Sequence, residues 1–217
     1  MLTALKFRLG ANQYGENNNC VSCRSFNDIK GDHAVKCGGS KNERVQKHDA
    51  VKNAIHKFAR SAGYIAVCES KNTFSENRQI PGDVRIDLWK AGRTGLFDIT
   101  ITHPTNQTII SKSQKEQGAA AELAFKRKND KFLRACDDIG HVFIPIGIKT
   151  FGFIHPESQK VLDTLINQYA TYNNSDVANA RQILYSNISI ALQIYNADMI
   201  IRRDPRYNGY DSGHGSE

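Results

Sequence analysis

The chain has 217 residues, of which 29 are Lys or Arg, 22 are Asp or Glu, and 40% are hydrophobic. This composition excludes a disordered or low-complexity protein, and the length suits one full domain with a smaller attached part. No stretch approaches the roughly 20 consecutive apolar residues of a membrane helix, and residues 1–10 lack the features of a signal peptide. We therefore expect a soluble, intracellular protein with no membrane partner.

The positive charge is concentrated toward the beginning of the chain. Residues 1–60 contain 11 Lys and Arg against 5 Asp and Glu, whereas residues 151–217 contain 5 against 7. A basic region of this kind favours a polyanionic partner such as nucleic acid. Ordinary solubility charge explains the net charge equally well, so other features must decide between the two interpretations.

Three of the five cysteines lie close together, in the pattern Cys20-x2-Cys23-x9-His33-x3-Cys37. Two thiolates from one tight turn, together with a nearby His and Cys, can complete a tetrahedral zinc site. Disulfides are the alternative, but an odd cysteine count and a histidine at ligand spacing argue against them. We expect structural Zn²⁺ here, because the intervening residues are too polar to fold on a hydrophobic core of their own.

Hydrophobic periodicity predicts alternating helices and strands after residue 40. The predicted helices span 43–62, 112–139, 156–172 and 176–203, and the predicted strands span 64–68, 83–88, 96–102 and 141–148. Strands joined partly by a hairpin and partly by a helical crossover indicate an α/β fold, with a mixed sheet flanked by helices and an αβββαβ core.

The same pattern suggests how the chain is organised. We expect an N-terminal segment with the zinc knuckle at 1–40, a core at 41–155, a helical appendage at 156–203 and a disordered tail at 204–217. The apolar residues of the appendage can pack on the core or form a dimer face, which makes a second copy of the chain a candidate partner.

Three acidic residues stand at the ends or in the middle of predicted strands. Glu69 follows the first strand, Asp83 begins the second behind a Pro-Gly turn, and Asp98 lies within the third. An ionised carboxylate inside an apolar strand is costly unless it is paired or binds a cation. Carboxylates on neighbouring strands can form a site for Mg²⁺ or Mn²⁺. On spacing alone, solvated acids and a salt bridge from Asp98 to Arg85 are an equally good interpretation.

Lys128 lies in the centre of the apolar stripe of the helix predicted at 112–139. At about 100° per residue, that stripe contains Ala121, Ala124, Phe125, Phe132, Ala135 and Cys136. A lysine on a buried face must be paired, snorkel outward or lose its proton. A lysine that points from a helix toward carboxylates and a cation suits phosphodiester cleavage, in which the metal polarises the phosphate and activates water.

Taken together, these motifs resemble the restriction-like endonuclease domain of site-specific non-LTR retrotransposon proteins, a branch of the PD-(D/E)XK nuclease superfamily. That family places a Cys-Cys-His-Cys knuckle just upstream of its nuclease core, as the cysteine cluster does here. Its Arg-His pair resembles Lys47-His48, and its Pro-Asp motif resembles Pro81-Gly82-Asp83. Its helical Lys-x-x-Lys-Tyr motif resembles Lys128-Asn-Asp-Lys131-Phe132, while Thr100 replaces the superfamily's usual lysine after the second acid.

The resemblance implies a restriction-endonuclease-like fold and a metal-dependent DNA endonuclease that acts in the nucleus, with branched or flapped DNA among its candidate substrates. It implies that Lys128 assists catalysis and that Mg²⁺ or Mn²⁺ is held by Glu69, Asp83, Asp98 and the carbonyl group of Ile99. The DNA contacts implied are Lys47, His48, Lys126 and Lys131. For His48, an ordinary capped or solvated histidine is the alternative.

A second hypothesis is a catalytically inactive nucleic-acid-binding module derived from such a nuclease, in which the zinc knuckle and the basic helix at 43–62 hold phosphates. We favour the enzyme, because Asp83, Asp98 and Lys128 are all present. A protein-interaction domain built on residues 156–203 would explain neither the knuckle nor Lys128.

Overall fold

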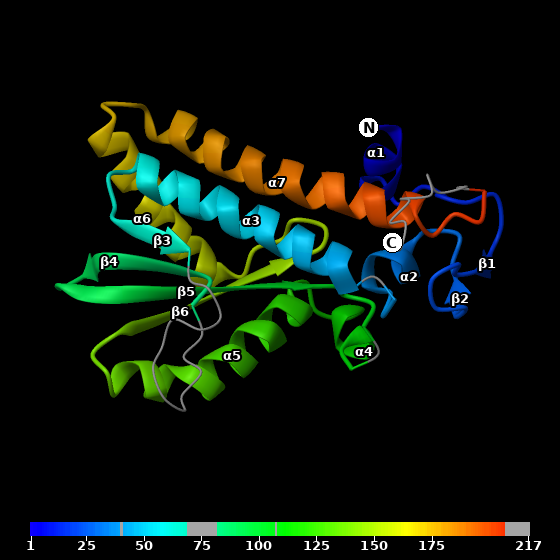
Figure 1. Ribbon diagram of the computed structural model, residues 1–217, viewed down its shortest axis with the longest axis horizontal. Helices are drawn as coiled ribbons and strands as arrows, with labels where there is room; N and C mark the ends of the chain where they lie inside the picture. The colour runs from blue at the N-terminus through cyan, green and yellow to red at the C-terminus, as the bar shows by residue number, and fades with distance from the viewer. Residues whose placement is uncertain (40, 69–81, 107, 207–217) are drawn as a thin grey trace, which may run out of the picture. The chain divides into compact units, whose positions relative to one another are not determined.

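The computed structural model describes residues 1–39, 41–68, 82–106 and 108–206, and it has a mixed α/β fold (Figure 1). The chain forms α1 (Leu2–Arg8), β1 (Asn18–Asn19), β2 (Phe26–Asn27), α2 (Asp32–Lys36), α3 (Lys41–Ser61), β3 (Ala66–Cys68), β4 (Val84–Lys90), β5 (Arg93–Thr102), α4 (Ile110–Ser113), α5 (Ala119–Asp137), β6 (Val142–Lys149), α6 (Pro156–Tyr172) and α7 (Val177–Ile201). Two compact units result. The smaller unit contains residues 1–46 and the segment from 193 onward, and the larger unit contains residues 47–192.

The larger unit is built on a four-stranded mixed sheet with the strand order β3-β4-β5-β6. The first two pairings are antiparallel, and β5 pairs with β6 in parallel from Gly95 to Thr102. The β4–β5 hairpin turns at Ala91 and Gly92, whose φ angles of 50° and 74° are typical of a two-residue hairpin turn. Parallel strands need a long crossover connection, and here α4 and α5 provide it.

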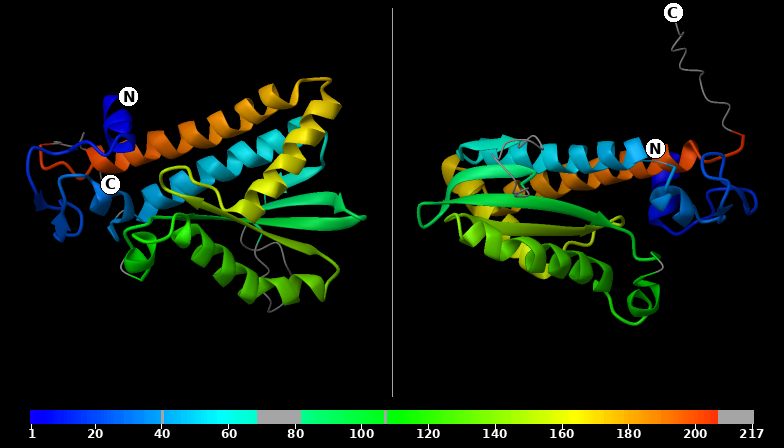
Figure 2. Two further views of the ribbon diagram at one scale, coloured as in Figure 1. Left: turned by 180° about the vertical axis from the view of Figure 1, so that it is seen from behind. Right: turned by 60° about the horizontal axis from the view of Figure 1, so that its bottom comes forward.

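Helices cover both faces of the sheet. Figures 1 and 2 show α3, α6 and α7 on one face and α5 on the other. Because side chains alternate along a strand, Phe97 and Ile99 of β5 pack with the first group of helices. Leu96 points the other way and packs with Cys136 of α5 and Phe143 of β6. The strand β5 is therefore buried on both faces.

Helices α6 and α7 share the main hydrophobic core with the sheet. Leu162, Leu165 and Ile166 of α6 and Leu184 and Ile188 of α7 are buried in the same cluster as the strand residues. The compact units therefore have different boundaries from the segments expected at 1–40, 41–155 and 156–203. Most of the expected tail at 204–217 lies outside the described residues.

The helix predicted at 112–139 is divided into α4 and α5, which begins only at Ala119. Gly118 precedes α5 with a φ of 91°, a left-handed conformation that interrupts a regular helix. A β-carbon at this position would lie 2.9 Å from the ring of Phe153, so the site also lacks room for a side chain. Periodicity missed the interruption because a glycine does not change the spacing of apolar residues.

The smaller unit has an apolar cluster of its own. Phe7 of α1, Tyr14, Val35 of α2 and Ile200 near the end of α7 are buried together, and the Tyr14 hydroxyl donates to the carbonyl oxygen of Ile200 at 2.9 Å. Sequence analysis gave the knuckle segment no core because these partners come from both ends of the chain. Among the described residues, no helix has the length and apolar character needed to cross a membrane.

We predict that Gly118→Ala lowers the free energy of unfolding by about 1–2 kcal/mol, because an alanine with positive φ is strained and its methyl group would meet Phe153. Urea unfolding followed by circular dichroism measures the change. Gly140→Ala is the matched control, because Gly140 also has a positive φ, 74°, but has open space around it. Equal losses for the two variants would show that the Phe153 contact contributes nothing.

Candidate functional site

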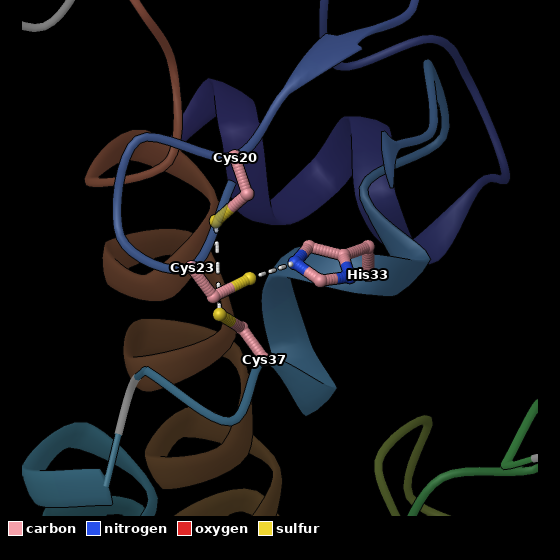
Figure 3. A group of neighbouring side chains, drawn as sticks. All are labelled: Cys20, Cys23, His33 and Cys37. Carbon is pink, nitrogen blue, oxygen red and sulfur yellow. Dashed lines mark hydrogen bonds between the residues drawn. The ribbon is translucent and has the colours of Figure 1, made fainter. Parts of the chain in front are cut away.

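The four predicted zinc ligands converge in the smaller unit. Their side chains point toward one another from the turn at Cys20 and Cys23 and from both ends of the α2 region (Figure 3). All four ligand atoms lie within 4.8 Å of one another, with Cys20 Sγ 3.6 Å from Cys37 Sγ and Cys23 Sγ 3.2 Å from His33 Nε2. Zinc–sulfur bonds of about 2.3 Å place tetrahedral ligand atoms about 3.8 Å apart. These four residues, the Cys3His cluster, could therefore hold a zinc ion.

The thiols of the cluster have different electrostatic surroundings. Hydrogen bonds from Ser25 lower the pKa of Cys23 to about 6, so this sulfur is a ready thiolate. Burial raises the pKa of Cys37, and the neighbouring Arg203 opposes that effect. A cation at the centre would stabilise all three thiolates, which is the usual reason that such a group of buried sulfurs remains charged.

Arg203 ties the segment after α7 to the Cys3His cluster. Its side chain is only 1% exposed, and its Nη1 donates to Glu43 Oε1 at 2.9 Å. Its guanidinium group also hydrogen-bonds Cys37, and its carbonyl oxygen accepts from Asn27 Nδ2 at 3.3 Å. A buried arginine requires such partners, because an unpaired buried charge is strongly destabilising.

A second group of functional side chains lies where β5 passes the beginning of β4. Asp83 Oδ2 accepts from the backbone N–H of Ile99 at 2.7 Å, which joins the acid before β4 to the middle of β5. His48 reaches the same place from α3, with its Nε2 3.1 Å from Asp83 Oδ2 and 3.0 Å from the carbonyl oxygen of Ile99. We call Asp83, Asp98, Lys128, His48 and the Ile99 carbonyl group the acidic cluster.

Asp98 and Lys128 form the other half of the acidic cluster. The Asp98 side chain is 7% exposed, and Lys128 Nζ donates to its Oδ1 at 3.2 Å. Its Oδ2 lies 2.9 Å from the same nitrogen but accepts no hydrogen bond within the described part of the chain. Burial raises the pKa of Asp98, although Lys128 acts in the opposite direction. This lysine is 34% exposed, so it is less buried than the helix pattern predicted.

Among the described residues, only the Cys3His cluster brings three or more His, Cys, Asp or Glu side chains close enough together to hold one ion. The acidic cluster contains ligand types that suit hard divalent cations. Such ions prefer carboxylate and carbonyl oxygens, which Asp83, Asp98 and Ile99 supply from adjacent positions. The buried Oδ2 of Asp98 still has lone pairs to offer. Thr100 lies two residues after Asp98 on β5, and its buried hydroxyl oxygen has no partner among the described residues. A threonine is neutral, so it adds no positive charge to this place.

The remaining predicted site residues have different surroundings. Glu69 lies outside the described residues, as does Pro81. Lys47 is buried, with 4% of its surface exposed, so its ammonium group is not offered to a large ligand. Lys126 is exposed and pairs with Glu122 at 3.1 Å, and Lys131 is exposed above the ring of Phe132.

Sequence analysis missed two features of these sites. His48 was assigned to DNA contact, but its ring lies against Asp83 and Ile99. Two effects oppose each other there: burial acts to lower the pKa of His48, and the hydrogen bonds and charges of Asp83 and Asp49 raise it overall. Arg203 carried no signal, because nothing local distinguishes it from the exposed Arg202 beside it.

In comparisons with known proteins, no family model matches the chain, and no curated sequence matches it significantly. The functional argument therefore rests on the geometry of the two clusters.

We predict that the purified chain contains one equivalent of zinc and that Cys37→Ser loses it, because three remaining ligands bind the ion too weakly to survive dialysis. Elemental analysis after dialysis measures the zinc content. Cys68→Ser, which changes a half-buried cysteine outside the cluster, should retain the metal. Equal zinc content in both variants would contradict the assignment.

We also predict that Arg203→Met destabilises the smaller unit by about 3 kcal/mol, because Glu43 and the Cys37 thiolate lose a buried cation. Hydrogen exchange of the amides of residues 12–37 should accelerate accordingly. Arg202→Met removes a surface ion pair to Asp198 and should change the exchange by less than about 0.5 kcal/mol. Similar exchange in the two variants would show that the Arg203 contacts are dispensable.

Proposed function

We propose that the protein is a divalent-metal-dependent DNA endonuclease of the restriction-like type. The observation that supports this proposal is that the Ile99 amide holds Asp83 beside β5, while Lys128 of α5 pairs with Asp98, the neighbour of Ile99. A core with the order α3, β3, β4, β5, α5, β6 agrees with the αβββαβ arrangement implied by the resemblance.

In this proposal the chain's own residues position the reacting groups. A divalent cation in the acidic cluster would polarise the phosphate and make water a better nucleophile. The attacking water loses a proton to solvent as its oxygen bonds to phosphorus, one P–O ester bond breaks, and the departing oxygen takes a proton from solvent. The Asp98 carboxylate holds the ammonium group of Lys128 at the sheet. There the ammonium group can orient the water or stabilise the charge that develops on the phosphate. The amide of Ile99 holds Asp83 in place.

The DNA would approach the face that carries α5. Lys126 and Lys131 are both exposed on this helix, five residues apart, and can contact phosphates near the scissile bond. In the smaller unit, Zn²⁺ in the Cys3His cluster would have a structural role, because four protein ligands leave no open position for a substrate.

A second candidate is a nucleic-acid-binding module without nuclease activity. The specific observation in its favour is Thr100, which stands where the superfamily carries its usual lysine. In that case, DNA affinity would depend steeply on salt and would be unaffected by Asp83→Ala.

We predict cleavage of supercoiled, branched or flapped DNA in the presence of Mg²⁺ or Mn²⁺, and a loss of at least about 100-fold in rate for Asp98→Asn and Lys128→Met. Single-turnover gel assays measure these rates. Asp163→Asn and Lys160→Met, which remove surface ion pairs from α6, are the matched controls and should cleave normally.

Equal residual cleavage by the wild type and Asp98→Asn would indicate a contaminating nuclease and contradict the proposal. Salt-dependent DNA binding by the wild type without metal-dependent cleavage would support the binding module instead.

A further inference from the structure

His48 makes an unusual pair of contacts through one ring nitrogen. Its Nε2 lies 3.1 Å from Asp83 Oδ2 and 3.0 Å from the Ile99 carbonyl oxygen, and both atoms are acceptors only. One N–H group can be shared between the two oxygens in a three-centre hydrogen bond, and Asp83 Oδ2 also accepts the Ile99 amide at 2.7 Å. The three atoms that meet here, an imidazole nitrogen, a carboxylate oxygen and a carbonyl oxygen, are also all of types that bind divalent metals.

The other ring nitrogen of His48 faces an acid of its own. Nδ1 lies 3.4 Å from Asp49 Oδ1, and Lys52 Nζ holds that oxygen at 2.8 Å. Histidines that bind metals commonly donate their second N–H to a carboxylate, which fixes the tautomer and directs the free lone pair at the metal. With the proton on Nδ1, the lone pair of Nε2 points at the two oxygens.

A cation between these atoms would take the place of the proton that His48 shares with the two oxygens. Neighbouring ligands of an octahedral ion bound at 2.1 Å are separated by about 3.0 Å. The two His48 distances match that separation, and Asp98, whose Oδ2 lies 2.9 Å from Lys128 Nζ, is the residue next to Ile99. The arrangement therefore has the form of a coordination sphere with one nitrogen donor.

We propose that His48 is a ligand of the divalent cation in the acidic cluster and binds it through Nε2. This inference rests on the proposed nuclease function and deepens it. Mg²⁺ prefers sites made only of oxygen, whereas Mn²⁺ accepts imidazole beside carboxylate and carbonyl groups. The nitrogen donor therefore makes the site selective for Mn²⁺ over Mg²⁺.

The test measures Mn²⁺ binding to the zinc-loaded full chain without DNA. Titration by electron paramagnetic resonance gives the affinity, and electron spin-echo modulation detects nitrogen bound to Mn²⁺, with ¹⁵N-histidine labelling to identify imidazole. The variants are His48→Gln and His48→Glu, and His56→Gln is the matched control. His56 lies on the same helix, and its Nε2 contacts the carbonyl oxygen of Ala66 at 3.1 Å, away from the acids.

We expect imidazole coupling in the wild type and in His56→Gln, and its loss in His48→Gln with about 10- to 100-fold weaker Mn²⁺ binding. His48→Glu should bind Mg²⁺ relatively better than the wild type, because it restores an all-oxygen site. The wild-type spectrum decides the question even if a variant does not fold.

Mn²⁺ binding without imidazole coupling, and with unchanged affinity in His48→Gln, would overturn this inference and make His48 a hydrogen-bonding partner only. The proposed function would survive that result if Asp98→Asn still abolished Mn²⁺ binding. Failure of the wild type to bind Mn²⁺ at millimolar concentration would overturn both.

Discussion

The burial of β5 on both faces is the constraint on which the larger unit depends. Its parallel pairing with β6 requires a crossover, and α5 returns over one face of the sheet while α3, α6 and α7 cover the other. Phe97 and Ile99 meet this constraint with apolar side chains, but Asp98 between them does not. A carboxylate at that position costs several kcal/mol unless a cation accompanies it.

Lys128 is the cation that accompanies Asp98 in the described structure, and the proposed function would add a divalent cation beside it. Lys128 reaches the carboxylate from α5, but it satisfies only Oδ1 with a proper hydrogen bond. Beside it, Asp83 and the Ile99 carbonyl group add further negative charge density that Lys128 does not contact in the described structure. Burial is the main cause of the raised pKa of Asp98, and the charge of Asp83 adds to it, while Lys128 and His48 act in the opposite direction. Lys128 pairs with Asp98 and His48 pairs with Asp83, so under the proposed function a divalent cation would join two ion pairs that already exist.

Much of this fold could be predicted from the sequence, because periodicity depends on which face of an element is buried. The helix predicted at 156–172 has the bounds of α6, and the angle of Lys128 on its helix correctly placed it toward the sheet. Periodicity could not show that α6 and α7 complete the core, because an apolar face does not identify the surface that covers it. It also could not find the break between α4 and α5 at Gly118, because that break depends on backbone conformation and not on the spacing of apolar residues.

The two candidate sites were predictable from the sequence to different degrees, because the ligands of one lie close together in the sequence and those of the other do not. The Cys3His ligands lie within one short segment, so their spacing alone indicated the site. His48 meets Asp83 and Ile99 across 35 and 51 residues, so only the fold shows that its ring faces the acids and not the solvent. Sequence can suggest that a histidine is functional, but its chemistry depends on what the fold places against each ring nitrogen.

The two clusters also differ in donor chemistry, and this difference would make each cluster prefer a different class of metal ion. Three sulfurs and one imidazole select a soft or borderline ion such as zinc, and they offer no oxygen ligand to Mg²⁺ or Mn²⁺. The carboxylate and carbonyl oxygens of the acidic cluster favour the harder ions. As a ligand, His48 would make the donor set of the acidic cluster more like that of the Cys3His cluster, because both classes of metal accept imidazole. The metal selectivity of the acidic cluster would then depend on how rigidly α3 and β5 hold the imidazole nitrogen and the oxygens. A tetrahedral ion needs wider separations between its ligand atoms than an octahedral ion does.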